Sequence, residues 1–73
     1  MNTTFAKDTV LEQLEADVRG ELRGRVRELQ LIIWRDGVVL RGFAQTYYAK
    51  QLAQHAVMAN THLPIVANEI EVH

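Results

Sequence analysis

The sequence predicts an α+β fold with the order helix–strand–strand–helix–strand. Three observations lead to it: an Asp-Gly pair stands between two apolar, β-branched segments, an Ala-rich amphipathic segment follows, and a short apolar segment closes the chain. Asp-Gly between such segments is a strong hairpin signal, and 73 residues leave room for one domain. We expect a flexible tail over residues 1–8 and, over residues 9–73, two helices packed on one face of a three-stranded mixed sheet.

The first helix is expected over residues 9–23. Thr9 and Glu12 have the spacing of a capping box, in which two side chains satisfy free backbone N–H groups at a helix start. Gly24 suits the left-handed position that follows a helix end. Apolar residues recur at helical spacing and form a narrow stripe, Leu11, Leu14, Val18 and Leu22. This stripe is the face that we expect to pack on the sheet.

Residues 28–35 and 38–43 are expected to form a hairpin with Asp36-Gly37 at its turn. A type I′ turn needs positive φ at both central residues, so positive φ is predicted at Gly37. The turn also fixes the register. The expected partners are Arg35 with Val38, Trp34 with Val39, Ile33 with Leu40, and Ile32 with Arg41. Because the segment 28–35 is the most apolar, we place this strand at the centre of the sheet.

The second helix is expected over residues 47–60, with Thr46 as its N-cap. Small alanine side chains on its apolar face allow close packing against a sheet. Pro64 cannot continue a helix, so the helix must end before it. Residues 65–72 alternate in polarity and are expected to form the last strand.

Short motifs along residues 9–72 follow a family pattern. They are a turn glycine, a glycine that ends the second strand, an Ala-rich helix and a terminal Asn-x-Ile-x-Val strand, here Gly37, Gly42, YYAKQLAQHAVMA and Asn68-Glu69-Ile70-Glu71-Val72. In this order the chain resembles the BON domain, named for osmotically induced periplasmic and nodulation proteins. It departs from that family at Leu63-Pro64-Ile65-Val66, where members usually carry a Gly-Val pair. The resemblance implies a non-catalytic module that associates with phospholipid or membrane surfaces and with protein assemblies.

Residues for catalysis or metal binding are not grouped in the sequence. Cysteine and serine are absent, and no nucleophile elbow or carboxylate pair occurs. His55 and His62 are seven residues apart with a helix end between them, and His73 is the last residue, so we interpret all three as surface histidines. We therefore expect no enzyme activity, no metal and no cofactor.

The charges nearly cancel, at −1 overall, which argues against a nucleic-acid binder that depends on bulk charge. Arg23, Arg25 and Arg27 cluster after the first helix. Pairs at i, i+4, Glu15 with Arg19 and Glu21 with Arg25, favour a self-neutralised helix end. A contact of Arg23, Arg25 and Arg27 with anionic lipid is the alternative. No basic and apolar leader and no membrane-spanning segment is found, so the expected location is cytoplasmic.

Alternation along the strands predicts one face that packs on the helices and one that does not. The core side is expected to hold Leu29, Leu31, Ile33, Val38, Leu40, Val66, Ile70 and Val72. The other side, called here the open face, then carries Ile32, Trp34, Val39, Arg41, Phe43, Glu69 and Glu71. So many large apolar residues on one exposed side indicate a partner surface. A second copy of the chain is the expected partner; the alternatives are that the N-terminal tail with Phe5 covers this side, or that the alternation breaks.

These features predict a binding or assembly module that acts through surface contacts with a protein or a phospholipid surface and that self-associates. A KH-like domain that binds single-stranded RNA is the alternative function, because KH domains share this order of elements. KH recognition depends on a GXXG loop, and no such sequence occurs in this chain. Nucleic acid is therefore the less expected partner.

Overall fold

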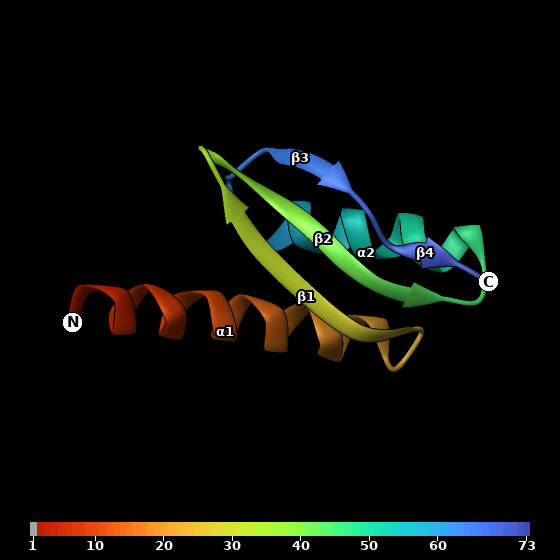
Figure 1. The fold of residues 1–73 in the computed structure, drawn as a ribbon. Coiled ribbons are helices and arrows are strands. Elements are labelled where there is room, and N and C mark those ends of the chain that lie inside the picture. Colours follow the sequence, from red (N-terminus) through yellow and green to blue (C-terminus); the bar gives the residue numbers. More distant parts are fainter. Residues whose placement is uncertain (1) are drawn as a thin grey trace.

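The computed structural model describes residues 2–73, with side chains from residue 9 onward, and has the predicted α+β architecture (Figure 1). The second helix appears where it was expected, the hairpin appears with shifted bounds, and the last expected strand is divided in two. The elements are α1 (Asn2–Leu22), β1 (Val26–Trp34), β2 (Gly37–Ala44), α2 (Tyr47–Asn60), β3 (Ile65–Asn68) and β4 (Glu71–Val72).

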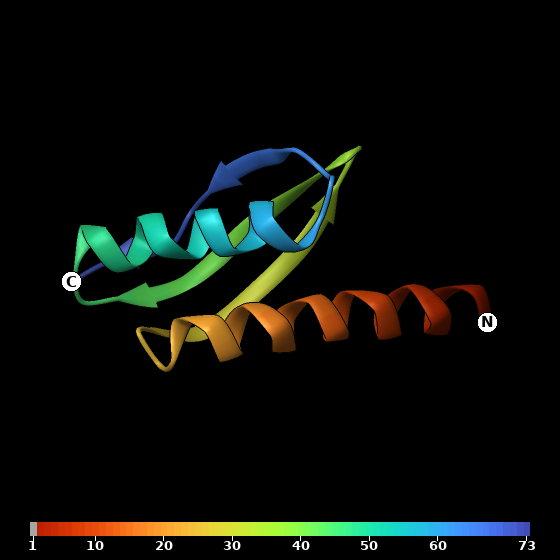
Figure 2. The same cartoon turned by 180° about the vertical axis from the view of Figure 1, so that it is seen from behind.

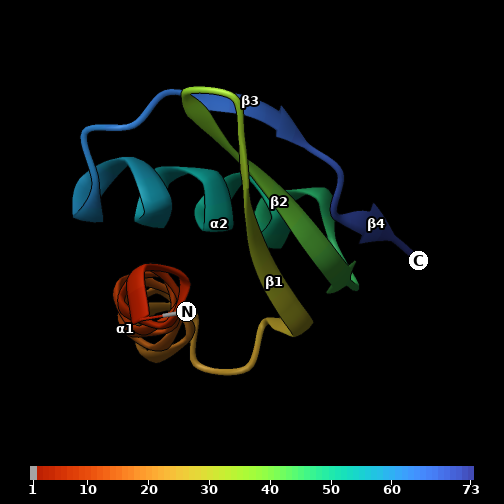
Figure 3. The same ribbon diagram turned by 60° about the vertical axis from the view of Figure 1, so that its left-hand side comes forward.

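Both helices lie on one face of a mixed sheet, as Figures 2 and 3 show from two further directions. The strand order is β1-β2-β3, with β4 also beside β2. β1 is antiparallel to β2, whereas β3 and β4 are parallel to it. The prediction that the first strand is central is wrong, because the crossover through α2 returns the chain to the far side of β2. β1 is consequently an edge strand.

α1 begins at Asn2, seven residues before the expected start at Thr9. Residues 2–8, expected as a tail, form its first turns; their flexibility in solution stays a prediction. Val18 and Leu22 are buried, and Leu11 and Leu14 pack partly against the core, as the stripe predicted. The helix ends at Leu22, where positive φ at Arg23 (51°) and Gly24 (81°) turns the chain toward β1.

The hairpin turn lies one residue earlier than predicted. The pairs are Trp34 with Gly37 and Ile33 with Val38, so Arg35 and Asp36 form the loop. Positive φ falls on Arg35 (58°), and the prediction of positive φ at Gly37 is wrong. Val38 thus faces Ile33 instead of Arg35, a change of two residues. Since side chains alternate with a period of two, this change leaves the assignment of the two faces of the hairpin intact.

Glycine is required at position 37 because there is no room for a side chain, not because of its φ angle. A Cβ atom on Gly37 would lie 2.5 Å from Cγ2 of Val66 and 2.7 Å from the carbonyl oxygen of Pro64. The same carbonyl accepts a hydrogen bond from the backbone N–H of Val38 at 2.9 Å. The absence of a side chain therefore lets the start of β3 lie directly against the start of β2.

A β-bulge in β1 was not predicted. The register shifts between Arg27 and Gln30, so that Glu28 and Leu29 together lie opposite Gly42, and Glu28 has a φ of 54°. Without the extra residue Val26 and Leu29 would point to opposite faces, because they are three positions apart. With the bulge both are buried in the core.

α2 spans the predicted residues, and the Thr46 side chain caps it by accepting a hydrogen bond from the N–H of Ala49 at 3.0 Å. Asn68 links β3 to this helix by a side-chain hydrogen bond. Its Nδ2 donates to the carbonyl of Lys50 at 3.0 Å, and its Oδ1 accepts from the N–H of Ile70 at 3.2 Å. The terminal Asn-x-Ile motif therefore places Ile70, between β3 and β4, in the core between the sheet and the helices.

The core contains most of the predicted residues, and three predictions of burial are wrong. The confirmed members are Leu29, Leu31, Val38, Leu40 and Ile70. Ile33 is 47% exposed, because it lies at the end of the sheet beyond the cover of the helices, and Val72 is exposed at the chain end. Val66 is 48% exposed for a different reason, considered with the site below. Among the described residues no helix combines the length and the apolar character needed to cross a membrane.

Candidate functional site

The open face of the sheet is the side that neither helix covers (Figure 3). The hairpin register places Ile32 opposite Val39 and Gln30 opposite Arg41, and Phe43 pairs with Glu71 of β4. The structure therefore brings the predicted residues of this face onto one surface. The N-terminal turns of α1 continue along the helix axis away from this face (Figure 1), so the tail does not cross it.

The apolar half of the open face surrounds a shallow hollow of about 350 Å³. Its lining is Ile32, Trp34, Val39, Arg41, Val66, Ala67 and Glu69. Trp34 is 54% exposed, and Ile32 is also exposed. The Arg35 guanidinium lies 5.6 Å from the centre of the Trp34 ring, which is cation–π distance. The Trp34 side chain is therefore about half exposed to solvent, next to the apolar hollow.

Val66 belongs to this hollow although it was predicted to be core. The parallel pairing of β2 with β3 is irregular, since Val38 pairs with Ile65 but Val39 pairs with Ala67. Ile65 packs against the core, and its neighbour Val66 points to the other side. The sequence departs from the BON pattern at Leu63-Pro64-Ile65-Val66, close to this shift in register, and no other feature of the sequence pointed to it.

A charged pair borders the apolar half. Nε of Arg41 donates to Oε1 of Glu69 at 3.1 Å, and both side chains are at least half exposed. Beyond it lies a polar hollow of about 710 Å³ that includes Glu28, Gln30 and Glu71. At the chain end Phe43 lies 5.6 Å, ring to ring, from His73, whose Nε2 is 3.8 Å from Glu71. The open face therefore has an apolar half and a half with mixed charges.

The three arginines Arg23, Arg25 and Arg27 are all exposed, and the structure brings only two of them to one hollow. Arg25 and Arg27 line a hollow of about 490 Å³ at the start of α2, together with Tyr48, whereas Arg23 does not line it. The predicted pair of Glu21 with Arg25 does not form, because Arg25 lies after the helix end and Glu21 instead accepts a hydrogen bond from Asn60 at 2.8 Å. The predicted pair of Glu15 with Arg19 is confirmed at 3.3 Å.

The part of the chain with described side chains holds no group of three acidic, histidine or cysteine residues able to bind a metal ion. His55, His62 and His73 are all exposed, as predicted. None of the family models, curated proteins or solved structures compared with the chain matches it. The resemblance to the BON domain therefore stays a prediction, and inferences about function depend on the open face itself.

Proposed function

We propose that this chain is a non-catalytic, BON-like assembly module that associates with a second copy of itself through the open face. The observation that carries the proposal is the half-exposed Trp34 beside an apolar hollow that is bordered by Arg41 and Glu69. Apolar centres with a charged rim and enriched in tryptophan and arginine are typical of protein interfaces.

Charge complementarity favours a second copy as the partner. Two open faces related by a two-fold axis can place Arg41 of each copy against Glu69 and Glu71 of the other. An isologous contact of this kind makes one surface serve as both partners. Such charges set the orientation of the copies more than they add affinity.

The expected association is weak to moderate. Burial of one large apolar side chain contributes about 1.5–3 kcal/mol, and the loss of rotational and translational freedom costs about 4–15 kcal/mol. A few half-exposed side chains, Ile32, Trp34 and Val66, therefore support a dissociation constant on the order of micromolar to millimolar. The chain should be monomeric when dilute and associated when concentrated.

Replacing Trp34 by aspartate is expected to weaken this association about tenfold or more, because a charge replaces the largest apolar group of the hollow. Sedimentation equilibrium over a concentration series measures the effect. Tyr48→Asp is the matched control, since Tyr48 is an exposed aromatic residue outside the open face and its loss should leave the dissociation constant unchanged. Equal association of the wild type and Trp34→Asp, with both folded by circular dichroism, would refute the proposal.

A further inference from the structure

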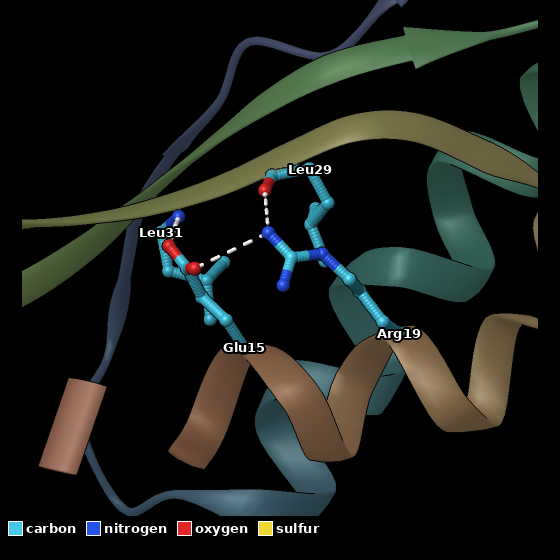
Figure 4. A network of polar contacts seen from close by, with 4 residues as sticks. All are labelled: Glu15, Arg19, Leu29 and Leu31. Atoms are coloured by element: carbon cyan, nitrogen blue, oxygen red, sulfur yellow. Dashed lines mark hydrogen bonds and ion pairs between the residues drawn. The ribbon is translucent and has the colours of Figure 1, made fainter. Parts of the chain in front are cut away.

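β1 is an edge strand, and α1 covers the first half of its edge. Nη2 of Arg19 donates to the carbonyl of Leu29 at 2.8 Å, and Oε2 of Glu15 accepts from the N–H of Leu31 at 2.8 Å (Figure 4). The two side chains also pair with each other at 3.3 Å, and that of Glu15 is only 17% exposed. Helix side chains thus occupy the positions that another strand would take along this half of β1.

The second half of the same edge has no such cover. The N–H of Leu31 points away from β2, and directions alternate along a strand, so the N–H and C=O of Ile33 point outward as well. Within the described part of the chain, no hydrogen bond from outside the hairpin reaches Ile33. Figures 1 and 3 show why: β1 and α1 diverge toward the hairpin turn. The outward backbone groups of residues 31–35 are called here the free edge.

Apolar side chains accompany the free edge. Ile33 is 47% exposed on the helix side of the sheet, and its neighbours Ile32 and Trp34 are exposed on the open face. Unpaired backbone donors and acceptors along an exposed apolar strand are a template for another strand. The occupant that fits the free edge is therefore an extended segment of chain.

We propose that this occupant is the free edge of a second copy, paired antiparallel about a two-fold axis at Ile33. The free edge is short and centred on Ile33, so each copy would donate the N–H of Ile33 to the carbonyl of the other. The same register sets Ile32 opposite Trp34 of the second copy, and such aromatic pairs with β-branched residues stabilise sheets.

Charge complementarity also favours a second copy over an unrelated peptide. The register sets Arg35 opposite Leu31 of the other copy, whose N–H is bonded to the Glu15 carboxylate. Arg35 of each copy would then lie within reach of the Glu15 carboxylate of the other, which already pairs with Arg19 at 3.3 Å. The axis is perpendicular to the sheet, so both α1 helices stay on the same side of the joined sheet as the side chain of Ile33.

This inference rests on the proposed self-association and adds a second contact, made by the backbone groups of the free edge. Edge pairing leaves both open faces uncovered on the same side of one continuous sheet. Pairs joined at the free edge could then stack through their open faces, which would give a closed tetramer. Ile32 and Trp34 belong to both surfaces, but the N–H of Ile33 serves only the edge contact and the side chain of Val66 only the open-face contact, so the failure of one can be recognised separately from that of the other.

The decisive variant is Ile33→Pro. Proline removes the outward N–H, and this N–H is not used in the β1–β2 ladder, so the hairpin keeps its own hydrogen bonds. The loss of two hydrogen bonds by symmetry should raise the dissociation constant of the edge contact about tenfold or more. Ile33→Val is the matched control, since it keeps the N–H and a β-branched side chain, and sedimentation equilibrium should show it unchanged.

Val66→Asp separates the two contacts, because Val66 lies on the open face in β3, and β2 separates β3 from the backbone groups of the free edge. Weaker association in Ile33→Pro alone would support edge pairing and refute the open-face contact. Weaker association in Val66→Asp alone would do the reverse. If Ile33→Pro fails to fold, amide hydrogen exchange of the wild type decides: the N–H of Ile33 should become protected as concentration rises. Exchange at Ile33 that stays fast while the chain associates would overturn edge pairing.

Discussion

Replacing Leu40 by alanine is expected to lower the free energy of unfolding by about 2–5 kcal/mol. Leu40 is 0% exposed, lies opposite the buried Leu31 in the sheet and belongs to the central strand, so the site cannot collapse without displacing several elements. Small domains have a total stability on the order of 5 kcal/mol or slightly more. Urea denaturation at a low protein concentration, where the chain is monomeric, measures the change.

Ile33→Ala is the matched control on the same hairpin. Sequence alternation assigns Ile33 to the core beside Leu40, but its side chain is 47% exposed. Its truncation should therefore cost less than about 1 kcal/mol in the monomer, in line with exposed sites elsewhere. An equal loss of stability in Ile33→Ala and Leu40→Ala would show that the helix side of the hairpin is covered along its whole length.

Gly37→Ala is expected to destabilise the fold by about 1–3 kcal/mol, as overpacking of a tight contact does. The added Cβ would lie 2.7 Å from the Pro64 carbonyl oxygen, which is a backbone atom and is held by the N–H of Val38. The start of β3 must therefore move away from β2, and Val66 moves with it. Thermal denaturation followed by circular dichroism gives the size of the effect.

The same change at Gly20 should have the opposite sign. A Cβ at Gly20 would meet nothing within 4 Å, and Gly20 lies within α1, so Gly20→Ala should stabilise by about 0.5–1 kcal/mol. Gly37→Asn distinguishes the two possible roles of Gly37. Asparagine tolerates positive φ but is larger than alanine, so a stable Gly37→Asn variant would contradict the close approach of β3.

The sequence predicted those elements whose start or end is set by local chemistry. Thr46 caps α2 as expected, and Gly24 takes the left-handed conformation after α1. The turn was misplaced because the preference of Asp-Gly for a type I′ turn is local, whereas the register is set by packing of β3 on Gly37. The bulge at Glu28 depends on long-range packing in the same way, since it serves to bring both Val26 and Leu29 into the core.

The open face could be predicted from alternation in β2 and in β1 after its bulge, where the faces follow the period of two. Val66 was missed because alternation fails where the β2–β3 register shifts, and a single sequence does not show with which residue a parallel strand pairs. The edge position of β1 was also missed. Its apolar composition suggested a central strand, but Ile32, Ile33 and Trp34 are exposed. The composition of a strand does not show whether its apolar side chains are buried.

The fluorescence of Trp34 across a concentration series tests self-association most directly, because this is the single tryptophan of the chain and it lies in the centre of the proposed contact. It is half exposed in the single chain, and contact with a second copy should remove it from water. We predict that its emission maximum shifts to shorter wavelengths as concentration rises, in step with the mass measured by sedimentation. A strict monomer at every concentration, with an unchanged emission spectrum, would contradict the account.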